Sequence, residues 1–193
     1  MKIDIILAGV GGQGILSIAA AIGQTALLNN LYIKQSEVHG MSQRGGAVMS
    51  HLRISDKPVA SDLIPAGEAD LIISVEPMEA LRYMPYLSST GWVITNSQPF
   101  ENIPNYPEIQ KIMDALNALP RKIVIDADPM AQTAGSIKSS NMVVLGASVP
   151  FLQMSYDSIK KGIEAIFGAK GQSIIDLNLK ALQMGYEFAE KRK

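Results

Sequence analysis

The chain has 193 residues, of which 47% are hydrophobic and 18% charged, and its formal net charge at pH 7 is −1. This length and balance predict a single domain over residues 1–193, with a full-sized core and buried parallel strands. No run of Lys or Arg is long enough for a DNA or RNA interface. With no signal-peptide pattern and no membrane-spanning apolar stretch, we expect a cytoplasmic protein without membrane attachment.

Cysteine is absent from the chain, and this absence excludes several kinds of site. The chain has no thiolate for an iron–sulfur cluster, a Cys-based zinc site, a disulfide or a Cys nucleophile. The histidines are His39 and His51, and they do not form an H-E-x-x-H motif. We therefore predict no metal site and assign no catalytic residue, so in a redox system another chain must carry the metal.

The first predicted element is a buried strand that ends in the glycine-rich turn Gly9-Val10-Gly11-Gly12-Gln13-Gly14. Its spacing fits G-x-G-x-x-G, in which the first glycine allows a tight turn, the second a close ligand and the third close helix–strand packing. An Ala-rich helix is predicted over 15–28, and its free N–H groups favour an anion such as phosphate. Packing alone is the competing interpretation, but the strand–turn–helix context favours a ligand or a functional interface.

A second strand is predicted over 32–35 and is followed by Glu37, near the position of the ribose-binding acid in nucleotide-binding folds. The spacing is slightly long, and a Glu at a strand end is common, so ribose binding is the less favoured interpretation. Residues 36–46 then combine polar side chains with glycines that free the backbone to turn. Arg44 suits a carboxylate or phosphate, and His39 donates or accepts near neutral pH. We interpret this segment as a functional loop rather than a solvated one.

Residues 47–55 alternate in polarity, which predicts a half-buried strand, with His51 on its polar face as a surface or interface residue rather than a catalyst. Asp56-Lys57-Pro58 is typical of a turn, so residues 59–61 are expected to return antiparallel. These patterns favour a mixed, mostly parallel sheet in a three-layer, Rossmann-like α/β domain.

The second half of the chain alternates predicted strands and helices. Glu76 lies between a strand and a helix, where helix-dipole stabilisation and a polar contact in a cleft are equally plausible roles. For Asp126 and Asp128, turn and cap chemistry is favoured over a metal or acid–base pair. Residues 141–153 fit a strand or a buried helix, with the helix favoured. The predicted strands are 69–75, 91–95 and 122–125, and the predicted helices are 76–83, 108–118, 158–167 and 176–193.

Three segments together resemble a known family: Gly9–Gly14, then Glu37-Val38-His39-Gly40-Met41-Ser42-Gln43-Arg44-Gly45-Gly46, then Glu76-Pro77-Met78-Glu79-Ala80-Leu81-Arg82-Tyr83. They are similar to the gamma-type component of the 2-oxoacid:ferredoxin oxidoreductases, and within it to the small (beta) subunits of the indolepyruvate branch. The likeness extends over essentially the whole chain, and its second segment is the most specific.

The resemblance implies a subunit of an enzyme that oxidatively decarboxylates a 2-oxoacid with coenzyme A and passes electrons to ferredoxin. It also implies that a large alpha subunit holds the thiamine diphosphate, its Mg ion and the iron–sulfur clusters. This chain would contact that subunit or coenzyme A. The candidate contact residues are Gly9, Gly11, Gly12, Gln13, Gly14, Glu37, His39, Gly40, Ser42, Gln43, Arg44 and Gly45.

Two alternatives stay open at this point. A stand-alone NAD- or FAD-binding oxidoreductase would use the same glycine turn and Glu37, with His39 as its plausible acid or base. A structural adaptor would use the turn for protein contact only.

Overall fold

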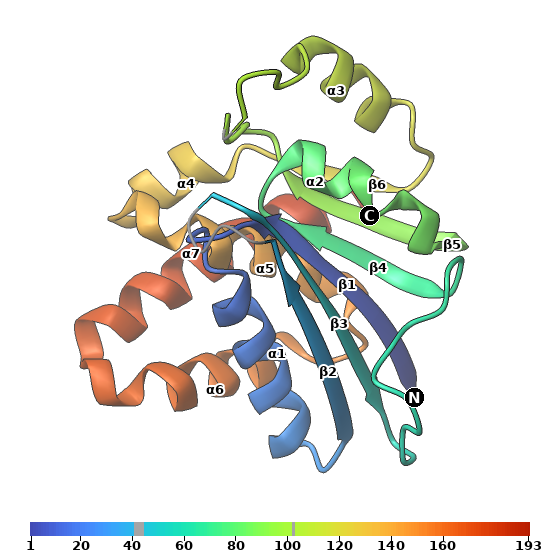
Figure 1. Ribbon diagram of the computed structural model, residues 1–193. Helices are drawn as coiled ribbons and strands as arrows, with labels where there is room; N and C mark the ends of the chain where they lie inside the picture. Colours follow the sequence, from blue (N-terminus) through green and yellow to red (C-terminus); the bar gives the residue numbers. More distant parts are fainter. Residues whose placement is uncertain (41–44, 102) are drawn as a thin grey trace.

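The computed structural model describes residues 1–40, 45–101 and 103–193, and within them it forms a six-stranded sheet of order β2-β3-β1-β4-β5-β6 (Figure 1). β3 runs antiparallel to both β1 and β2, whereas the pairs β1–β4, β4–β5 and β5–β6 are parallel. The prediction of a mixed, mostly parallel α/β sheet is therefore confirmed. The strands are β1 Lys2–Val10, β2 Tyr32–His39, β3 Ala47–Ser55, β4 Ala69–Ser74, β5 Leu87–Asn96 and β6 Lys122–Ile125.

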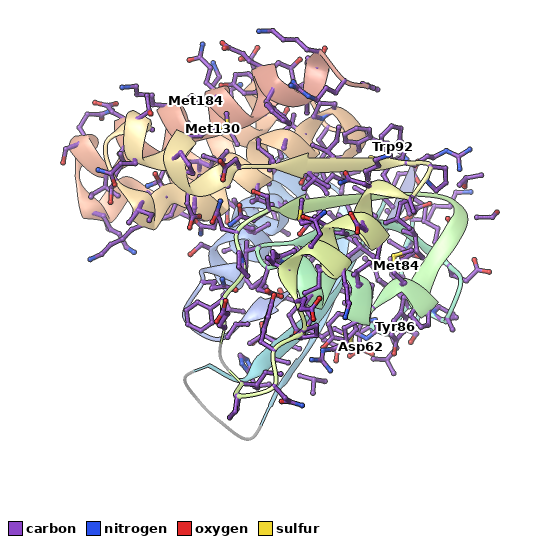
Figure 2. The ribbon with its side chains drawn as sticks, turned by 90° about the horizontal axis from the view of Figure 1, so that it is seen from above. Asp62, Met84, Tyr86, Trp92, Met130 and Met184 are labelled. Atoms are coloured by element: carbon purple, nitrogen blue, oxygen red, sulfur yellow. The ribbon has the colours of Figure 1, made fainter. Side chains whose placement is uncertain are left out.

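Helices cover the two faces of this sheet unequally. One face carries α1, α4, α5, α6 and α7, and the other carries α2 and α3 (Figure 1). Figure 2 shows the same division in side chains, with Met130 and Met184 in the larger helical layer and Met84 and Tyr86 in the smaller one. The helices are α1 Ile15–Leu28, α2 Pro77–Arg82, α3 Ile109–Asn117, α4 Ala127–Ala134, α5 Ser140–Ser148, α6 Tyr156–Phe167 and α7 Gln172–Glu190, with 3₁₀ turns η1 Met84–Tyr86, η2 Ile137–Ser139, η3 Val149–Phe151 and η4 Gly168–Lys170.

β1 lies near the middle of the sheet and is buried on both faces. Ile5 and Leu7 point into the core under the larger helical layer, and Ile6 points into the smaller core. A strand covered on both sides needs a continuous apolar run, which is the pattern that this segment has.

Among the described residues, no helix is long and apolar enough to cross a membrane.

α5 confirms the preference for a helix in residues 141–153 and packs closely against α7. A Cβ atom on Gly146 would collide with the Leu182 carbonyl oxygen, and one on Gly185 would collide with the Val143 carbonyl oxygen. The missing side chains let the two backbones approach, and every residue of α5 from Asn141 to Ser148 is buried.

The prediction of a returning strand at residues 59–61 is wrong, because that segment lies outside every strand. Arg53 instead holds the segment after residue 60 through hydrogen bonds. Its Nη1 donates to the backbone oxygen of Ser61 at 3.2 Å and to that of Leu63 at 2.8 Å. Arg53 also pairs with the buried Asp4 carboxylate through Nε at 2.8 Å and Nη2 at 3.0 Å.

His51, predicted to be a surface or interface residue, is instead buried inside the chain, since only 3% of its surface is accessible. The segment between β3 and β4 covers it, and the Ile64 N–H donates to His51 Nδ1 at 3.1 Å. The Tyr86 ring packs edge-on against the imidazole with centroids 5.3 Å apart. Burial lowers the pKa of His51, opposed by nearby Asp62 and reinforced by Arg53.

Candidate functional site

The centre of the sheet has the topology at which open α/β folds form a ligand crevice. β1 and β4 are parallel neighbours, yet β1 leads into α1 on one face and β4 leads into α2 on the other. Chains that leave adjacent strand ends in opposite directions open a crevice at the carboxyl edge of the sheet. The predicted glycine turn lies at this edge.

The glycine turn is closed by its own glutamine. Gln13 Oε1 accepts the Val10 N–H at 2.8 Å, while the Gln13 N–H donates to the Val10 oxygen at 3.1 Å. Gly12 and Gly14 adopt φ values of +101° and +83°, which side-chain-bearing residues rarely adopt. Nothing lies within 4 Å of a Cβ on Gly12, so its backbone faces open space. Gly14 caps α1, whose first N–H groups have no helical acceptor.

The glycines divide their roles differently from the prediction. Gly9 belongs to β1 itself, and a Cβ there would collide with the side chains of Val75 and Ile15. Gly9 thus serves the close helix–strand packing that was expected of the third glycine. The positive φ values that the turn needs are adopted by Gly12 and Gly14, because β1 continues to Val10 and the chain changes direction only after it.

The structure brings the glycine turn together with the ends of the second predicted segment. The Gly11 N–H donates to the Gly46 oxygen at 2.9 Å, and the Gly45 N–H donates to the Gly11 oxygen at 3.4 Å. The Gly40 N–H donates to the Ala47 oxygen at 2.8 Å. The candidate residues Ser42, Gln43 and Arg44 lie outside the described residues.

Glu37 and His39 lie on a strand rather than in a loop, because β2 continues to His39 in register with Val48. This corrects the predicted strand end at Gln35. The two side chains form an ion pair when His39 is protonated. His39 lines a cavity of about 320 Å³ with the glycine turn and Leu16, on the β2 side of the turn.

A second cavity, of about 440 Å³, lies on the other side of the glycine turn. We call it the crevice; it is lined by Gly12, Gln13, Gly14, Ser17, Val75, Asn96, Asp128, Ile137, Lys138, Ser140 and Asn141. Sequence reasoning missed Lys138 and Asn141, since nothing in their local pattern separates them from an ordinary loop and helix start. Asn141 Nδ2 donates to the Gly14 oxygen at 3.0 Å, so α5 holds the start of α1 directly.

The polar wall of the crevice is built around Asn96, at the end of β5. Its Oδ1 accepts the Ala127 N–H at 3.0 Å, and its Nδ2 donates to Asp128 Oδ1 at 3.1 Å. Asp126 accepts from Ser97 Oγ at 3.2 Å and from Gln98 Nε2 at 2.7 Å. The two carboxylates thus join the ends of β5 and β6 to α4. Among the described residues, no group of three or more His, Asp or Glu side chains could hold a metal ion.

Glu76 takes the first of the two roles considered for it, at the start of α2, and it does not line the crevice. It is fully buried, and its Oε2 accepts the Glu79 N–H at 2.7 Å, capping α2. Its Oε1 accepts the Phe100 N–H at 3.3 Å and the Tyr106 hydroxyl, which ties the segment after β5 to α2. Burial raises the pKa of Glu79, although its ion pair with Arg82 opposes the rise. Burial and the Glu76 carboxylate together raise the pKa of Tyr106.

Relatives match the chain over nearly its whole length. The family model "Pyruvate ferredoxin/flavodoxin oxidoreductase" covers residues 4–188. The indolepyruvate oxidoreductase subunit IorB of Archaeoglobus fulgidus is 40% identical, over 98% of this chain and 96% of the relative. The corresponding subunit of Thermococcus kodakarensis is 36% identical, over 97% and 96%.

Solved structures of the same enzyme class share the fold. A 2-oxoglutarate:ferredoxin oxidoreductase of Magnetococcus marinus, solved with 2-oxoglutarate, coenzyme A and succinyl-CoA, has a TM-score of 0.78 at 21% identity; the match covers 100% of this chain and 32% of that one. The keto/oxoacid ferredoxin oxidoreductase gamma subunit of Geobacter sulfurreducens has a TM-score of 0.72 at 23% identity, over 98% and 99%. The chain therefore belongs to the pyruvate ferredoxin/flavodoxin oxidoreductase family, among its gamma-type subunits.

Proposed function

We propose that this chain is the subunit without redox cofactors of an indolepyruvate-type 2-oxoacid:ferredoxin oxidoreductase in the cytoplasm. The complex would convert an aryl 2-oxoacid and coenzyme A to an acyl-CoA and carbon dioxide, with the electrons passing to ferredoxin. The observation that carries the proposal is the identity of 36–40% to four indolepyruvate oxidoreductase subunits along nearly their whole length.

The residues of this chain do not fit the redox cofactors of such an enzyme. Iron–sulfur clusters are held mainly by cysteine thiolates, and the chain has no cysteine. The sequence also contains no Gly-Asp-Gly segment of the kind that anchors thiamine diphosphate through a metal ion. We therefore assign these cofactors, and the decarboxylation itself, to a catalytic partner subunit.

The glycine turn and the crevice fit a contact with coenzyme A. The start of α1 offers N–H groups and the positive end of a helix dipole to a phosphate. Lys138 adds a positive charge at the rim of the same cavity. In this proposal Gly9, Gly11, Gly12, Gln13 and Gly14 form the coenzyme side of the contact region.

The carboxyl edge of the sheet also fits a contact with the partner subunit. Large apolar side chains are exposed on four separate segments there, all at the carboxyl ends of strands or helix starts: Leu16, Val38, Phe100 and Ile137. Exposed apolar groups rimmed by polar ones are typical of protein interfaces. Glu37, His39, Gly40, Ser42, Gln43, Arg44 and Gly45 form the partner side of the contact region.

The proposal is tested by reconstitution with the catalytic subunit. Indolepyruvate-dependent reduction of ferredoxin is measured for the catalytic subunit alone, for this chain alone and for the co-purified complex, each with and without coenzyme A. We expect activity only in the complex and only with coenzyme A. Full activity of the catalytic subunit alone would show that this chain is not a functional subunit.

The stand-alone NAD- or FAD-dependent alternative is disfavoured by the relatives, and a titration separates the two directly. The isolated chain is titrated with coenzyme A, NAD and FAD by calorimetry. Our proposal expects binding of coenzyme A only. Tight binding of NAD or FAD by the isolated chain would support the alternative.

A further inference from the structure

β5 begins with a bulge at the amino edge of the sheet, where the parallel strands start and away from the glycine turn. Its first residue, Leu87, pairs with Ala69 of β4. The next paired residue is Trp92, opposite Leu71, so residues 88–91 leave the regular ladder. Figure 2 labels Trp92, the first residue after the bulge. Bulges redirect side chains and are common beside binding sites, so the surroundings of this bulge are of interest.

The bulge borders a cavity of about 180 Å³, which we call the bulge cavity. Its apolar wall comes from η1, from the start of β5 and from the connection between α3 and β6: Met84, Leu87, Leu119 and Pro120. The rest of the lining is Ser88, Ser89, Gly91 and Arg121. Because a water molecule takes about 30 Å³ in the liquid, the bulge cavity has room for a molecule of about six or seven non-hydrogen atoms.

The hydroxyl group of Ser88 has no hydrogen-bond partner. Its Oγ is buried, and among the described residues it is the side-chain polar atom that is buried without a partner. A buried polar group without a partner lowers stability, so packing alone gives no reason for a serine here. Rotation about the Cα–Cβ bond turns this hydroxyl toward the bulge cavity, where it can donate a hydrogen bond.

Arg121 adds a positive charge to the same cavity. Its Nη1 donates to the Ser89 oxygen at 2.9 Å, which holds the guanidinium against the bulge. Within the part of the chain that the structure describes, Arg121 forms no ion pair with a carboxylate, whereas Arg53 and Arg82 each do. A guanidinium presents a planar fork of N–H donors that matches a carboxylate. Since this one is already held in place, it loses little freedom when it binds.

We propose that the bulge cavity binds a small monocarboxylic acid with a short apolar chain. The carboxylate pairs with the Arg121 guanidinium and accepts a hydrogen bond from the Ser88 hydroxyl. The apolar chain packs against Met84, Leu87 and Leu119. This site goes beyond the proposed function and does not depend on it, because the bulge cavity lies at the amino edge of the sheet and shares no lining residue with the crevice.

The test compares isovalerate with isovaleramide, which has the same carbon chain and no charge. Binding to the full chain is followed by NMR through the backbone N–H signals of residues 88–91 and Arg121. We expect isovalerate to bind at least about tenfold more tightly than isovaleramide, the effect of hydrogen bonds to a charged group. It should shift the signals of the bulge and leave those of the glycine turn unchanged.

Two pairs of variants assign this preference to the bulge cavity. Arg121→Gln should abolish it, whereas Lys122→Gln, which removes the same charge from the next residue, outside the cavity lining, should retain it. Ser88→Ala should weaken isovalerate about fivefold, the effect of one hydrogen bond. Thr90→Ala is its control, since Thr90 is exposed in the same bulge but does not line the cavity. Because the Ser88 hydroxyl has no partner in the chain, Ser88→Ala should keep or raise the melting temperature.

Equal affinities for isovalerate and isovaleramide would overturn the proposal, as would a preference that survives Arg121→Gln in a variant with native circular dichroism. A fall in melting temperature in Ser88→Ala without weaker isovalerate binding would also overturn it, because the hydroxyl would then serve the fold alone. Should Arg121→Gln fail to fold, Ser88→Ala decides the same question. None of these results bears on the proposed subunit role, which the reconstitution with the catalytic subunit tests separately.

Discussion

His51 is buried although its strand alternates in polarity, and its chemistry makes the fold sensitive to acid. Its Nδ1 is the acceptor for the Ile64 N–H, so this nitrogen carries no proton in the folded state. Protonation would break that bond and bury a positive charge beside Arg53. Its hydrogen bond holds the segment between β3 and β4 against the sheet, in the layer where Figure 2 labels Asp62 and Tyr86.

We predict that this histidine reduces the stability of the chain at mildly acidic pH. Its pKa is lowered in the folded state, so as pH falls below 6.5 the unfolded chain binds a proton that the folded chain binds poorly. The free energy of unfolding should therefore decrease from pH 7.5 to pH 5, and less steeply in His51→Gln, whose amide oxygen still accepts a hydrogen bond. Urea unfolding at each pH measures both slopes, and identical slopes would contradict the prediction.

At the scale of elements, periodicity predicts the strands and helices well but not what covers them. The apolar run of β1 and the alternation of β3 correctly indicated strands. Alternation alone placed His51 on a polar face, as a surface or interface residue, because the segment that covers it comes later in the chain and contains no strand. The same limit applies to the site: the glycine turn was recognisable from its spacing, whereas Lys138 and Asn141 join it only through the packing of α5 on α1.

The crossing of α5 and α7 depends on two glycines, and we predict that a single methyl group there is destabilising. Gly146→Ala would drive a Cβ into the Leu182 carbonyl oxygen, which is backbone and has no rotamer with which to move away. Overpacking of this kind costs about 3 kcal/mol of unfolding free energy. Gly168→Ala is the matched control, because nothing lies within 4 Å of its Cβ, and it should change stability by less than about 1 kcal/mol. Thermal unfolding measures the melting temperature of each variant. Equal melting temperatures for Gly146→Ala and Gly168→Ala would contradict the prediction, because α5 and α7 could then move apart at no cost in stability.

At the scale of the whole molecule, the two ends of the sheet differ in their surfaces. The carboxyl edge combines the cavities, the glycine turn and exposed apolar side chains such as Leu16 and Val38. The amino edge of the sheet also has exposed leucines nearby, in the last turn of α1. The glycine turn and its cavities lie instead at the first turn of α1. α1 thus carries an exposed leucine in its first turn, Leu16, and two in its last, Leu27 and Leu28, which permits a comparison of the two ends.

We predict that Leu16→Glu weakens binding to the catalytic subunit by about tenfold or more, because a charge would be buried without a partner in an apolar contact. Leu28→Glu is its control: Leu16 and Leu28 are 49% and 51% exposed on the same helix, so both variants should remain folded. Binding is measured by co-purification and by calorimetry with the isolated catalytic subunit, after circular dichroism has established native helix content. If Leu28→Glu disrupts the complex while Leu16→Glu does not, the partner docks at the end of the sheet away from the glycine turn, and coenzyme A cannot be shared between the two chains across that edge.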